Sequence, residues 1–113
     1  MYKAIKNFAA AQANAEEVKA FEKAAQRTAE INAAKELSTD GFTSADHYKS
    51  YLRGFDKEAI VDGIETLEDR SKNDRVLALN PELSAKDSFE RLTLSYARLV
   101  YVQWYKEVLA TYE

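Results

Sequence analysis

The chain has 113 residues, a net charge of −3 and no cysteine, with 46% hydrophobic and 31% charged residues. This length and balance predict one folded domain, 1–113, rather than a disordered chain. The lack of cysteine excludes disulfides, thiolate-bound zinc and thiol catalysis. The slight acidic excess is also far from the strongly basic surface of a typical nucleic-acid-binding domain, so nucleic acid is disfavoured as a partner.

Neither membrane insertion nor secretion is predicted. No apolar run approaches the ~18 residues that a membrane-spanning helix requires. The start of the chain carries Lys3 and Lys6 before an alanine-rich stretch, but Gln12 and Asn14 interrupt that stretch. This interruption argues against a signal peptide. We therefore expect a cytoplasmic protein that makes no contact with a membrane.

The first part of the chain predicts two helices. Residues 2–13 predict a short helix, which makes 1–13 a candidate separate N-terminal helix. Asn14, followed by Glu16 and Glu17, is typical of a helix start, because Asn accepts a hydrogen bond from a free backbone N–H and carboxylates favour the positive helix end. We expect the second helix to run from 15 to about 36. An alternative joins both segments into a single long helix.

A turn and a short helix follow. The sequence "STDGF" at 38–42 predicts the turn, with Gly41 adopting a positive φ. Thr43 or Ser44 then caps a helix that reaches Arg53.

The next helix is expected to begin at Asp56 and to end near Ser71. Gly63 lies inside this helix, where glycine costs about 1 kcal/mol relative to alanine. A close approach of another backbone would be one reason for a glycine there. The segment 72–83 is expected to be irregular, with one helical turn at 75–79 ended before the proline.

The last helix is predicted to begin at Ser84, with Asp87 three residues on, and to run to the C-terminus. It includes "LVYVQWY" at 99–105, which has strand-like composition but lies in a segment without Gly or Pro from 82 to 113. Its apolar residues also recur at helical spacing on both sides, so we expect a helix.

This helix carries two apolar stripes, where roughly 100° of its circumference would suffice to lie on a core. Two alternatives follow: it is the central helix of the protein, or it offers one stripe to a partner. The fold expected is an all-α, compact bundle of four to six helices, with the long, largely apolar C-terminal helix at its centre. The first stripe is Phe89, Leu92, Tyr96, Leu99 and Val100. The second is Leu94, Ala97, Tyr101, Tyr105, Val108 and Tyr112, with Trp104 between the two.

Two sets of residues are candidates for binding another protein. The second stripe is rich in tyrosine, which joins an apolar ring to a polar tip and suits a surface that is wet when alone and dry when bound. Its candidate anchors are Tyr101, Trp104, Tyr105, Val108 and Tyr112. An acidic strip could either be a plain solvated face or attract a basic protein surface. It consists of Glu58, Asp62, Glu65 and Asp69.

Catalytic and metal sites are not predicted. His47 is the only histidine, and without a second His or a Cys it is poor evidence for a metal site. No nucleophile elbow, phosphate-binding loop or dinucleotide motif occurs. We therefore expect no enzyme activity, no catalytic residue, no bound metal and no cofactor.

The function expected is that of a non-catalytic, small protein-binding module: an inhibitor, adaptor or regulator that acts sterically. A phage- or mobile-element-type inhibitor of a host complex would suit such a chain. The partner is another protein with a basic surface, or a second copy in a homodimer. One alternative is a nucleic-acid-associated helical regulator, with Lys49 and Arg53 as phosphate contacts. A second is a small enzyme with an unrecognised carboxylate/His site.

Overall fold

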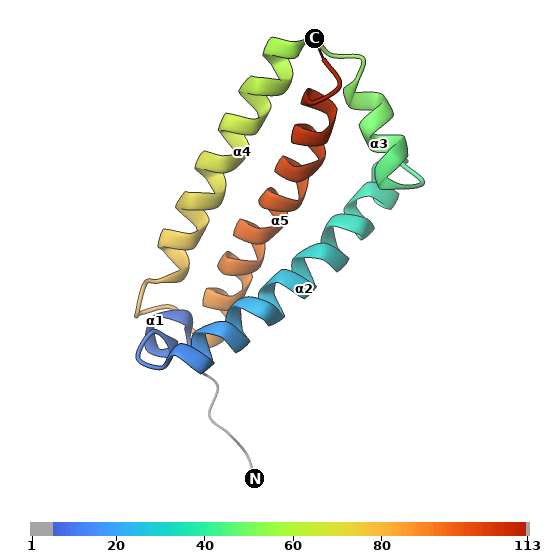
Figure 1. The fold of residues 1–113 in the computed structure, drawn as a ribbon. Helices are drawn as coiled ribbons and strands as arrows, with labels where there is room; N and C mark the ends of the chain where they lie inside the picture. Colours follow the sequence, from blue (N-terminus) through green and yellow to red (C-terminus); the bar gives the residue numbers. More distant parts are fainter. Residues whose placement is uncertain (1–5, 113) are drawn as a thin grey trace.

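The computed structural model describes residues 6–112, which form helices and contain no strand (Figure 1). The helices are α1 Phe8–Ala11, α2 Ala15–Thr39, α3 Ala45–Leu52, α4 Lys57–Ala78 and α5 Ala85–Leu109. The C-terminal helix α5 runs between α2 and α4 and packs against both. The prediction of an all-α bundle with this helix at its centre is confirmed.

Polar N-cap residues determine where the helices begin. Each accepts a hydrogen bond from a backbone N–H of the first turn that would otherwise lack a partner. These residues are Asn7, Asn14, Ser44, Asp56 and Ser84. The last four agree with the sequence prediction, and Gly41 has the expected positive φ, at 91°.

Several predicted helix bounds were wrong. Within the described residues the N-terminal helix spans only Phe8–Ala11, and residues 2–5 of the prediction lie outside them. Helix α2 continues to Thr39, beyond the expected end near residue 36, and α5 ends at Leu109.

Helix α4 also continues through 72–78, which we expected to be largely irregular. Two of the buried positions near the end of α4, Ser71 and Asp74, hold polar residues. The sequence therefore shows no apolar periodicity there, although the segment is helical. The buried residues of α4 are Ile60, Ile64, Ser71, Asp74 and Ala78.

Gly63 faces an aromatic ring rather than another backbone, which corrects the expectation for this residue. A Cβ atom added to Gly63 would lie 2.5 Å from Cε2 of Tyr105, far inside van der Waals contact. The absence of a side chain on α4 therefore makes room for the Tyr105 ring of α5.

We expect Gly63→Ala to lower the free energy of unfolding by about 1–3 kcal/mol, because the new methyl group overpacks this contact. Without the contact the same change would raise stability by about 1 kcal/mol through helix propensity. Urea denaturation followed by circular dichroism measures the sign. Thr66→Ala, at an exposed position in the same helix, is the control. A more stable Gly63→Ala protein would show that Tyr105 does not pack here.

Two apolar clusters lie along α5. One joins α3, α4 and the C-terminal half of α5, and contains Leu52, Ile60, Ile64, Val102 and Val108. The other joins α1, α2, the end of α4 and the start of α5, and contains Phe8, Ala25, Ala78 and Leu92.

Between the clusters, α4 and α5 are joined by buried polar residues. The hydroxyl of Ser71 donates to the carbonyl of Ser95 at 2.9 Å, and the hydroxyl of Ser95 donates to the carbonyl of Ser71 at 2.8 Å. The buried carboxylate of Asp74 accepts from Arg98 at 2.6 Å and from Arg91 at 3.4 Å. These polar groups have partners, as buried polar groups require, and they fix α4 against α5.

Candidate protein-binding site

Three of the five predicted aromatic-stripe anchors belong to the apolar cluster around Val102 or pack against it. Val108 is 0% exposed, which corrects its expected place on a binding surface. Tyr105 and Tyr112 are half-buried and pack against the same apolar cluster. The Tyr112 hydroxyl donates to the carbonyl of Phe55 at 2.5 Å, just after α3. These side chains therefore hold α3 and α4 to α5.

The other two anchors, Tyr101 and Trp104, are half-buried near α3. Their ring centroids are 5.0 Å apart, and each also meets the Tyr48 ring edge-on, at 5.6 and 5.8 Å. Burial raises the pKa of the Tyr48 and Tyr101 phenols above its ordinary value. This aromatic cluster fixes the orientation of the Trp104 indole.

Helix α5 remains uncovered on two sides, because α2 and α4 flank it without enclosing it. Leu94 is 42% exposed and Leu99 is 40% exposed. Five residues apart, they point about 140° away from each other around the helix. Leu94 lines a hollow with Leu67 and Arg70 of α4, whereas Leu99 lines one with residues of α2.

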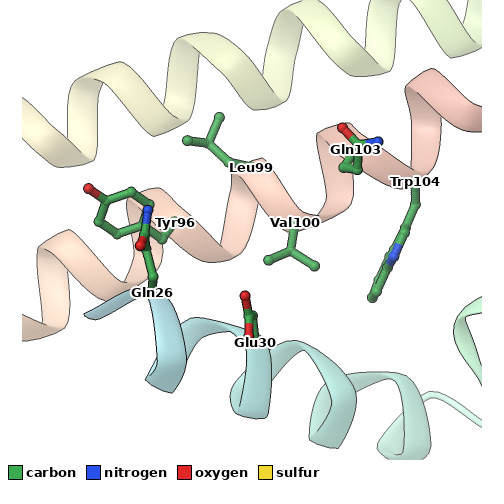
Figure 2. A pocket seen from close by; sticks show the side chains of 7 residues that line it. All are labelled: Gln26, Glu30, Tyr96, Leu99, Val100, Gln103 and Trp104. Carbon is green, nitrogen blue, oxygen red and sulfur yellow. The ribbon is translucent and has the colours of Figure 1, made fainter. Parts of the chain in front are cut away.

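A groove runs between α2 and α5 on the Leu99 side (Figure 2). Its first hollow has a volume of about 450 Å³. The residues lining it are Gln26, Glu30, Tyr96, Leu99, Val100, Gln103 and Trp104. A second hollow of about 540 Å³ continues toward the turn before α3 and includes Leu37, Phe42, Glu30 and Trp104. The two hollows together are called the α2–α5 groove below.

The chemistry of the groove is an apolar floor with a polar rim. Large apolar or aromatic residues of α5 supply the floor, and exposed side chains of Gln26, Glu30 and Gln103 supply the rim. Ligand sites in proteins have this mixture, in which apolar area provides affinity and a few polar groups fix orientation. The apolar floor and polar rim of the groove are therefore suited to binding a partner.

One end of the groove is held by a hydrogen-bonded triad from three helices. Arg75 of α4 pairs with Glu22 of α2 at 2.5 Å, and the Tyr96 hydroxyl of α5 donates to the same carboxylate at 3.0 Å. The hydrogen bond from Arg75 lowers the pKa of Glu22, which keeps the carboxylate charged. The triad fixes the position of Tyr96 at this end of the groove.

The acidic strip does not share a surface with the groove. Its four residues, Glu58, Asp62, Glu65 and Asp69, are exposed. They lie on the side of α4 opposite the buried residues that pack toward α5. Within residues 6–112 these carboxylates form no ion pair.

His47 has a local structural role. Its Nδ1 accepts from the backbone N–H of Thr43 at 3.1 Å, and its ring packs edge-on against Phe42 at 5.1 Å. Nearby Lys49 is paired with Glu107 at 3.2 Å and Asp46 at 3.5 Å. In the described part of the chain, no three His, Cys, Asp or Glu side chains are grouped to hold a metal ion. Among the same residues, no helix is both long and apolar enough to span a membrane.

The α2 wall of the groove was missed in the sequence. The signal for it is a polar pair four residues apart, Gln26 and Glu30, that borders the buried small residues Ala25, Ala29 and Ala33. Comparison with known proteins adds no relative, since no family model, curated protein or solved structure matches the chain. The function is therefore inferred from the residues of the groove itself.

Proposed function

We propose that the chain is a non-catalytic protein-binding module whose α2–α5 groove receives a segment of another protein. The observation that supports this proposal best is the exposed Leu99 in an apolar hollow over the central helix. Burying apolar surface stabilises a complex by about 25 cal/mol per Å² before the costs of association. A partner side chain placed on Leu99 and Val100 would provide such burial.

The mode of action that follows is steric. The groove walls are fixed by the Glu22–Arg75–Tyr96 triad at one end and by the aromatic packing of Trp104 at the other. A fixed groove binds with little ordering cost. When the groove binds a segment of a partner, that segment can no longer make its other contacts. An inhibitor or regulator can act in this way without catalysing a reaction.

We expect Leu99→Lys to weaken partner binding by at least about tenfold, because a charge would enter the apolar floor. Leu94→Lys is the matched control, with the same change on the same helix and similar exposure but on the other open side. The measurement is affinity capture from the cells that produce the chain, with each variant as bait. Both variants should keep the melting temperature of the unmodified chain within a few degrees.

Equal capture by Leu99→Lys and the unmodified chain would contradict a binding role for the groove. Loss of capture with Leu94→Lys alone would move the site to the opposite side of α5. Light scattering across a dilution series tests whether the occupant is a second copy of the chain. In that case the unmodified chain forms a dimer that dissociates on dilution, and Leu99→Lys forms none.

A further inference from the structure

We infer that the segment bound in the α2–α5 groove presents an arginine to the point where the two hollows meet, between Glu30 and Trp104. This inference rests on the function proposed above. The residues that line both hollows are Glu30 and Trp104. A chain that passes from one hollow to the other therefore runs past both a carboxylate and an indole ring.

The charge of Glu30 is available to a partner. It is exposed, and within residues 6–112 it forms no ion pair. Arg27, one turn earlier on α2, is exposed and forms no ion pair with Glu30 within the same residues. The groove thus has one negative charge without a counterion at its centre.

Trp104 adds a second preference for a cation. Its ring makes edge-to-face contacts with Tyr48 and Tyr101, which fix its orientation, and the negative face of an indole attracts cations. A guanidinium group is planar, so it can stack on the ring and still donate to a carboxylate, whereas an ammonium group is a compact point charge. Arginine is therefore the residue whose chemistry fits both sides of the junction.

The neighbours of this arginine are expected to be apolar. On one side of the junction the groove floor is Leu99 and Val100, and on the other side it includes Leu37 and Phe42. The partner is therefore a segment with an arginine flanked by aliphatic or aromatic residues.

Selection of random dodecapeptides displayed on phage against the full chain tests this inference. We expect the enriched peptides to contain arginine with apolar neighbours, and Glu30→Arg to select acidic residues in its place. Glu65→Arg, the same change on the acidic strip, is the matched control and should select the same peptides as the unmodified chain.

A synthetic enriched peptide then isolates the charge. Replacing its arginine by citrulline, which keeps the shape but removes the charge, should weaken binding by about 3- to 10-fold. The same replacement should have little effect on binding to Glu30→Gln, because the two changes remove one interaction.

Two results would overturn the inference, and they differ from failure of the proposed function. Peptides that lose binding to Leu99→Lys but show no excess of arginine would leave the groove as the site and remove the arginine. Peptides that bind the unmodified chain and Glu30→Arg equally well would also show that no arginine is required beside Glu30. If no peptide is enriched, or if enriched peptides bind Leu99→Lys normally, the groove itself is not the site and both proposals fail.

Discussion

Replacing Tyr105 and Tyr112 together by alanine is expected to lower the free energy of unfolding by about 3–6 kcal/mol, enough to unfold a marginally stable domain. Tyr105 fills the space that Gly63 leaves open on α4. Tyr112 packs on the Val108 cluster and donates to backbone carbonyls after α3, at Arg53 and Phe55. Urea denaturation followed by circular dichroism measures the loss.

A matched pair of exposed rings serves as the control for this double change. Tyr51 and Phe55 are both exposed, so replacing them together by alanine should cost clearly less. If the Tyr105/Tyr112 variant instead keeps its stability within about 1 kcal/mol, these rings are not core residues, and the second stripe of α5 becomes a surface for a partner.

Phe8→Ala is expected to lower the free energy of unfolding by about 3–5 kcal/mol, as for other large aromatic residues removed from a core. Phe8 is 0% exposed, and its ring centroid lies 5.2 Å from that of Phe21. The guanidinium of Arg75 lies over the Phe8 ring, 5.4 Å from its centroid. Its backbone N–H also donates to the buried hydroxyl of Ser88 at 2.8 Å.

Ile31→Ala is the control for this prediction, since it removes a large apolar side chain that is 50% exposed. Surface changes of this kind usually alter stability by less than about 0.5 kcal/mol. Equal, small losses for Phe8→Ala and Ile31→Ala, measured by the same denaturation, would mean that α1 does not pack on the rest of the bundle.

Helix starts and the helical state of "LVYVQWY" could be predicted from the sequence because the signals are local. An Asn, Ser or Asp that satisfies the first-turn N–H groups acts on residues two or three positions away, and Asn14, Ser84 and Asp56 do so in the structure. The absence of Gly and Pro from the last segment is equally local.

The end of α4 could not be predicted, because tertiary partners decide it. Ser71 and Asp74 interrupt the apolar repeat, yet both are buried against α5 through hydrogen bonds to Ser95 and Arg98. A sequence does not show that a buried aspartate will meet an arginine 24 residues later.

The groove depends on long-range geometry in the same way. A helix with two apolar stripes does not reveal which stripe its neighbours cover. Here α3 and α4 cover Val108 and Tyr105, and Leu99 remains open where α2 passes. Trp104 was singled out in the sequence, whereas Glu30 of α2 becomes a neighbour only through folding.

The fluorescence of Trp104 tests the central claim most directly, because it is the only tryptophan of the chain and lines both hollows of the groove. The captured partner is titrated into the unmodified chain while the indole of Trp104 is excited and its emission spectrum is recorded. The emission of the partner alone is subtracted. Occupation of the groove should exclude water from the indole and shift its emission to shorter wavelength. The Leu94→Lys variant should show the same shift, and the Leu99→Lys variant should show none. Saturable binding that leaves the Trp104 emission unchanged would contradict the account, since the partner would then lie elsewhere.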